Sequence, residues 1–174
     1  MSRKILVGFI IFLLIWVCLF SQINFFNRIP LWGTAANIGL VFIVGIGLLS
    51  GKLPGSLVGG AYGILLDILF GKSIGIYFCL YSIAGFSSGI FSKNVSKDNK
   101  LTFVYMTAAF TVAVELLTYL IFVVLYGYSF EIFPVIGMIV KETIYNMFLA
   151  RILFKFLVGI GEMINRSKNS YYLL

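Results

Sequence analysis

Six long apolar stretches, separated by short polar segments, organise the sequence. They cover residues 5–20, 34–50, 53–70, 74–91, 101–126 and 132–157. A helix that crosses the hydrocarbon region of a bilayer needs about 20 mostly apolar residues. The pattern therefore predicts an all-α integral membrane protein, in which residues 1–174 form a single transmembrane domain built as a six-helix bundle.

The first apolar stretch is expected to remain in the protein. It is longer than the apolar core of a usual signal peptide, and the following residues, SQINFFN, contain no small-residue cleavage motif. We therefore count it as the first membrane span.

Lysine and arginine residues gather in every second connecting segment. If the N-terminus is cytoplasmic, the outer segments carry two of them, Arg28 and Lys72. The inner segments then carry eight, namely Arg3, Lys4, Lys52, Lys93, Lys97, Lys100, Arg166 and Lys168. Cytoplasmic loops of membrane proteins are enriched in Lys and Arg, so we expect both termini in the cytoplasm.

Composition supports the membrane assignment and narrows the function. Hydrophobic residues make up 61% of the chain and charged residues 11%, with a mean hydropathy of +1.07. Soluble domains carry roughly 25% charged residues. The sequence contains no histidine, and its two cysteines lie inside apolar stretches. We therefore expect no catalytic triad, metal site or cofactor. The net charge of +7 reflects cations at span ends, so we expect no nucleic-acid partner.

A run of regularly spaced glycines marks the third stretch, GKLPGSLVGGAYGILLDILFGKSIG. Gly55, Gly59 and Gly63 are four residues apart and fall on nearly the same helix face, where small residues let two helices approach closely. Two interpretations remain open: internal helix packing, or a groove that receives a partner's helix. The candidate residues for this seam or groove are Gly55, Gly59, Gly63, Asp67, Gly71, Gly75, Gly85 and Gly89.

Asp67 takes the place where the next glycine of the series would stand. It lies 13 residues after Pro54, which is about 20 Å along a helix, in the outer half of the membrane. A carboxylate at that depth is costly unless it is paired or hydrogen-bonded. Either it makes a structural hydrogen bond to a helix end or a hydroxyl, or it couples to a proton or a ligand.

Further polar residues lie inside the last two stretches. Glu115 and Lys141 fall at similar depths on helices that run in opposite directions, which suggests an ion pair between them. Alternatively, Lys141 and Glu142 mark a break, with 132–140 at the outer surface. Asn146 lies one turn after Glu142, and side chains so placed usually join helices together.

These motifs resemble the MreD family, the multispanning rod shape-determining proteins of bacteria. The matching elements are Gly51, Gly55 and Gly59, then GILLD at 63–67, Gly71, GIY at 75–77 and GFSSG at 85–89. The segment ETIYNMFLARILFKFL at 142–157 is similar to the last span of the family, with Tyr145 and Asn146 at its Tyr-Asn pair.

The resemblance implies a non-enzymatic scaffold of the cell-elongation machinery in the bacterial cytoplasmic membrane, which helps to regulate lateral peptidoglycan synthesis. Its expected partners are membrane lipid and the bitopic protein MreC, and through MreC the MreB filament and the RodA–transpeptidase complex. The resemblance also implies a fold like that of the substrate-binding subunits of energy-coupling-factor transporters.

Two other functions are weighed against the scaffold. A vitamin-type substrate-binding subunit of a transporter would have the same size and number of spans, with Asn37, Asp67, Tyr77 and Tyr81 as candidate ligand contacts. A membrane acyl- or phosphotransferase would need a nucleophile with a base, or a cluster of acids. Six acidic residues spread over a chain without histidine do not favour it.

Overall fold

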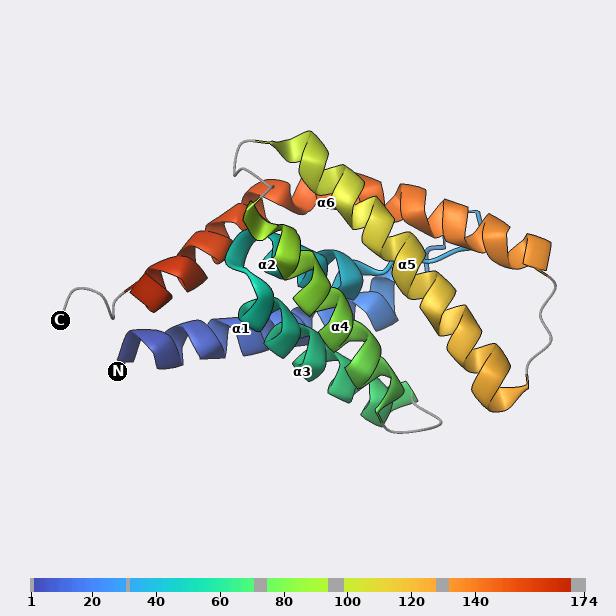
Figure 1. The fold of residues 1–174 in the computed structure, drawn as a ribbon, viewed down its shortest axis with the longest axis horizontal. Coiled ribbons are helices and arrows are strands. Elements are labelled where there is room, and N and C mark those ends of the chain that lie inside the picture. Colours follow the sequence, from blue (N-terminus) through green and yellow to red (C-terminus); the bar gives the residue numbers. More distant parts are fainter. Residues whose placement is uncertain (1, 31, 71–74, 94–98, 128–131, 170–174) are drawn as a thin grey trace.

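The computed structural model describes residues 2–30, 32–70, 75–93, 99–127 and 132–169 (Figure 1). Over these residues the chain forms six α-helices, a π-helical turn and a 3₁₀ turn. The α-helices are α1 (Ser2–Ser21), α2 (Ile38–Ser50), α3 (Lys52–Phe70), α4 (Ile76–Ile90), α5 (Lys100–Tyr126) and α6 (Ile132–Asn169). Each predicted apolar stretch overlaps one of these helices, which confirms the all-helical class over the described residues.

Among the described residues, three helical segments are long and apolar enough to cross a membrane: Ile5–Phe26, Lys52–Phe70 and Lys100–Leu125. The first extends α1 through the π-helical turn Gln22–Phe26. With 13 and 15 residues, α2 and α4 are about 20 Å long, shorter than the hydrocarbon core. In α6, charged residues interrupt the apolar sequence. Six complete spans therefore remain a prediction.

The shortest helix, α2, is the core of the bundle. Leu40, Val41, Ile43, Val44 and Ile46 have no accessible surface. α3, α4 and α6 pack around this helix, and α1 and α5 also contact it. Full enclosure by protein explains why a helix of this length is apolar on every side.

Two helix pairs cover the core. α3 and α4 lie side by side as an antiparallel pair, and α5 and α6 form a second pair whose far ends diverge (Figure 1). The start of α1 and the end of α6 lie at the same end of the molecule (Figure 1). That arrangement is the one expected of a chain that crosses the bilayer an even number of times.

Glycine allows the backbones of α3 and α4 to touch. A Cβ atom on Gly59 would collide with the carbonyl oxygen of Tyr81, and one on Gly63 with that of Tyr77. Gly55 and Gly85 face each other in the same way, each with its α-carbon against the other's carbonyl. At the end of the seam, Gly89 meets the backbone of Lys52. The glycine face is therefore filled by α4 within the protein.

Gly75, another glycine of the predicted set, lies outside this contact. Gly75 precedes α4 with a φ of 109°, a left-handed conformation that favours glycine, and a Cβ atom there would meet nothing within 4 Å. Gly71 lies outside the described residues.

We expect Gly59→Ala to lower the free energy of unfolding by about 1–3 kcal/mol, because the added methyl group must push α3 and α4 apart. The matched control is Gly159→Ala on the exposed side of α6, where the added methyl group meets nothing within 4 Å. This control should be as stable as the wild type or slightly more stable, since alanine favours helix. Denaturant unfolding in detergent micelles measures both, and equal stability of the two variants would contradict the seam.

Candidate functional site

Asp67 joins the end of α3 to the start of α4. One carboxylate oxygen, Oδ2, accepts hydrogen bonds from the backbone N–H groups of Gly75 at 2.9 Å and Phe78 at 3.0 Å. The other oxygen, Oδ1, accepts from the N–H of Tyr77 at 3.0 Å. The first N–H groups of a helix lack partners within it and favour negative charge. The structure thus shows the helix-end hydrogen bonds that would let a carboxylate stay 98% buried.

A second polar centre surrounds the start of α2. The Asn37 side chain caps this helix by accepting from the N–H of Leu40 at 3.0 Å. Its amide group also donates to the hydroxyl of Tyr81 on α4 at 2.9 Å. The backbone N–H of Asn37 donates to Oδ1 of Asn146 on α6 at 2.8 Å. Asn37 therefore connects the start of α2 to α4 and to α6.

Gln22 holds the same segment from the side of the first helix. Its amide donates to the carbonyl of Ala36 at 2.8 Å, and its Oε1 accepts from the N–H of Ile38 at 3.1 Å. Sequence reasoning missed this residue. The polar residues in SQINFFN were the signal that could have indicated it. However, Gln22 lies in a π-helical turn, which changes the helix register, so the periodicity of an α-helix does not predict which way its side chain points.

Glu115 and Glu142 meet between α5 and α6. Their carboxyl groups interact with each other, and the side chains of Asn146 and Asn37 interact with Glu142. Asn146, fully buried, donates onward to the hydroxyl of Thr111 at 3.2 Å. We name the side chains of Gln22, Asn37, Tyr81, Thr111, Glu115, Glu142 and Asn146 the polar network.

The predicted ion pair between Glu115 and Lys141 is not formed in the structure. Lys141 is exposed, and its ammonium donates to the carbonyl of Trp32 at 3.3 Å. Adjacent residues point about 100° apart around a helix, so Glu142 faces α5 where Lys141 does not. The alternative break at 141–142 is absent too, because α6 runs unbroken from Ile132 to Asn169.

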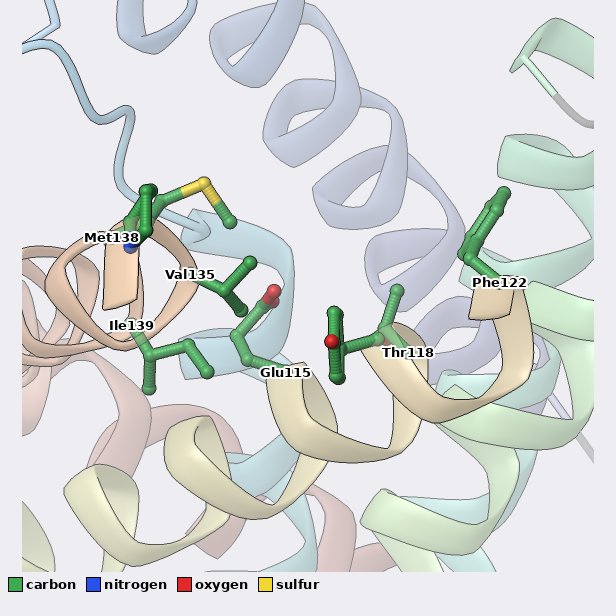
Figure 2. Close-up of a pocket in the computed structure, with 8 residues that line it drawn as sticks. Glu115, Thr118, Phe122, Val135, Met138 and Ile139 are labelled. Carbon is green, nitrogen blue, oxygen red and sulfur yellow. The ribbon is translucent and has the colours of Figure 1, made fainter. Parts of the chain in front are cut away.

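Two cavities flank Glu115. An apolar cavity of about 460 Å³ lies between α5 and the first turns of α6, with Thr118, Phe122, Val135 and Met138 among its walls (Figure 2). A smaller cavity of about 240 Å³ lies on the side of α2 and α4, and its walls are about half polar, with Leu66 and Phe70 of α3 as apolar members. Its walls include Gln22, Asn27, Asn37, Tyr77, Tyr81, Glu115 and Thr118. Three of the four candidate ligand contacts predicted from the sequence therefore line one cavity, and Asp67 does not.

A family model described as rod shape-determining protein MreD matches residues 2–161 of the 174-residue chain. The chain belongs to the MreD family. The resemblance read from the glycine series and the Tyr-Asn pair is thus confirmed. No curated protein and no solved structure matches the chain significantly, so the likeness to transporter subunits stays a prediction.

The two residues of the Tyr-Asn pair in this MreD protein, Tyr145 and Asn146, make contacts on different faces of α6. Asn146 points inward and bonds to Asn37 and Thr111. Tyr145 packs edge to face on Phe26, at the end of the π-helical turn, with ring centroids 6.1 Å apart. Together they hold the segment that leads into α2.

We expect Asp67→Asn to destabilise this MreD protein by about 1–3 kcal/mol. Asparagine has a single acceptor oxygen, so at least one buried N–H of α4 loses its partner. Glu162→Gln is the control, since the ion pair of Glu162 with Arg166, at 3.6 Å, joins solvent-accessible side chains, and its loss should change stability by less than about 0.5 kcal/mol. Thermal unfolding in detergent measures the stability of both variants. An Asp67→Asn variant as stable as the control would contradict the role of Asp67 in capping α4.

Double-mutant cycles test the acid pair. Glu115→Gln and Glu142→Gln should show a coupling energy of about 0.5–3 kcal/mol, because the two side chains interact with each other. Glu115→Gln and Lys141→Gln should be additive within about 0.5 kcal/mol, because these side chains do not meet. The reverse pattern, with coupling to Lys141 and none to Glu142, would restore the ion pair predicted from the sequence.

Proposed function

We propose that this MreD protein is a non-enzymatic scaffold of the bacterial cell-elongation machinery. It lies in the cytoplasmic membrane with both termini in the cytoplasm, and it binds a bitopic MreC-like protein. Through that partner it reaches the MreB filament and the RodA–transpeptidase complex and helps to regulate lateral peptidoglycan synthesis. The observation that carries the proposal is the family match over residues 2–161, and family membership supports a role in rod shape determination.

The distribution of apolar surface supports contact through the outer faces of the bundle. The glycine seam is filled by α4, so it offers no groove to a partner in this arrangement. By contrast, α1 exposes Phe9, Phe12 and Trp16, and α5 exposes Leu120 and Val124. Helices in lipid associate through close packing, and these outward faces are the surfaces available for it. The partner would thus bind a bundle that is already assembled.

The vitamin-transporter alternative has one observation in its favour, the smaller cavity beside Glu115. Its volume of about 240 Å³ is below the roughly 300–1,000 Å³ usual for small-molecule pockets. The hydrogen-bonding groups of Asn37 and Gln22 that line it are also used within the protein. These features favour the scaffold.

Affinity purification tests the scaffold. The tagged protein, extracted in a mild detergent from cells that produce the MreC-like protein, should retain that partner, whereas an unrelated multispan membrane protein with the same tag should not. The Glu162→Gln variant should retain as much partner as the wild type, and Gly59→Leu should retain less because the bundle that presents the outer faces is disturbed. Retention no higher than with the unrelated protein would contradict the proposal.

A further inference from the structure

The second half of α6 has two different faces, and one of them is fixed to the core. Leu157 is buried and lies against Gly45 of α2, and Gly161 packs on Leu49 near the end of the same helix. The Asn165 side chain donates to the carbonyl of Leu49 at 2.9 Å. These contacts hold the helix in one orientation, so the side chains on its opposite face also keep a defined direction.

The opposite face carries a narrow basic stripe. Between residues 151 and 167 the exposed residues fall within about 140° of the helix circumference, since each residue advances it by about 100°. We name these residues the basic stripe: Arg151, Ile152, Lys155, Phe156, Gly159 and Arg166. Arg166 pairs with Glu162 at 3.6 Å. Neither Arg151 nor Lys155 has a hydrogen bond or an ion pair with any residue that the structure describes.

Arg151 and Lys155 therefore form a pair of cations without a counter-charge. Four residues apart on a helix, their side chains are neighbours, and like charges so placed repel each other. Ile152 and Phe156 flank the pair and are 59% and 53% exposed. A helix face that combines cations with exposed apolar side chains suits the head-group level of a bilayer, where phosphates and hydrocarbon are both within reach.

The position of the cation pair along the bundle agrees with that level. Arg151 is 19 positions beyond Ile132, the first residue of α6, and so lies about 28 Å along the helix, close to the roughly 30 Å thickness of the hydrocarbon core. Phe154, between the two cations, packs on Phe103 with ring centroids 5.2 Å apart. Phe103 lies in the first turn of α5, so the pair is level with one end of that helix.

We propose that Arg151 and Lys155 bind the head group of an anionic phospholipid. The guanidinium and the ammonium group donate charge-assisted hydrogen bonds to its phosphate, and an acyl chain lies against Ile152 and Phe156. An acidic protein segment fits less well, because it would leave these two apolar side chains without a matching surface. The inference rests on the membrane location in the proposed function, but not on the binding of the MreC-like partner.

Two lipids with the same chains and different head groups test the site. Anionic phosphatidylglycerol and zwitterionic phosphatidylcholine are titrated against the full-length protein in detergent, with native mass spectrometry as the measurement. Phosphatidylglycerol should bind about tenfold more tightly, because basic residues at the membrane surface favour anionic lipid. Glycerol phosphate and polyglutamate, which are anionic but have no chains, should bind more weakly than phosphatidylglycerol. Equal affinity for the two lipids, or polyglutamate bound as tightly as phosphatidylglycerol, would overturn the proposal.

Paired variants separate this site from general charge attraction. Arg151→Gln with Lys155→Gln should bind the two lipids about equally. The control, Arg28→Gln with Lys141→Gln, removes the same charge from exposed residues outside the stripe and should keep the preference of the wild type. If the first pair does not fold, Lys155→Gln alone should lower the preference to about threefold.

An unchanged preference in either stripe variant, or an equal loss in the control, would contradict the site. Retention of the MreC-like partner is a separate measurement, because no surface assigned to that partner belongs to the basic stripe. Loss of the lipid preference in the wild type with the partner retained would therefore refute this inference and leave the scaffold standing.

Discussion

Direct backbone contact between α3 and α4 is the constraint on which the rest of the structure depends. A membrane offers little hydrophobic drive between helices, so association requires surfaces that fit closely. Gly55, Gly59 and Gly63 supply that surface on α3, and Gly85 and Gly89 supply it on α4. The contact brings the end of α3 beside the start of α4, where Asp67 satisfies three N–H groups that lipid would leave without partners. A helix of 15 residues is thereby held at both ends.

The polar network performs the same task around α2. This helix is enclosed by apolar side chains, yet its first turn must bond to something other than water. Asn37, Gln22 and Asn146 meet that need from three different elements. The acid pair of Glu115 and Glu142 extends the network to α5. In this way α5 and α6, many of whose apolar side chains are exposed, are connected to the core by hydrogen bonds as well as by packing.

Much of this architecture could be predicted from the sequence, because apolar length and glycine spacing report directly on helices in lipid. The position of Glu115 opposite residues 141–142 of α6 was also predictable, but the residue that it contacts was not. Depth places Lys141 and Glu142 together, whereas the face of the helix separates them by about 100°. Gln22 escaped prediction because a π-helical turn carries no sequence period. The cavities depend on how far α5 and α6 diverge, which no local pattern encodes.

Hydrogen exchange at the start of α4 tests the central constraint most directly. In lipid nanodiscs, the amide protons of Tyr77 and Phe78 should exchange as slowly as those in the middle of α4, since Asp67 holds them. In Asp67→Ala the same amides should exchange faster while the bilayer stays the same, so lipid shielding is controlled for. Rapid exchange in the wild type, or equal protection in both proteins, would contradict the account.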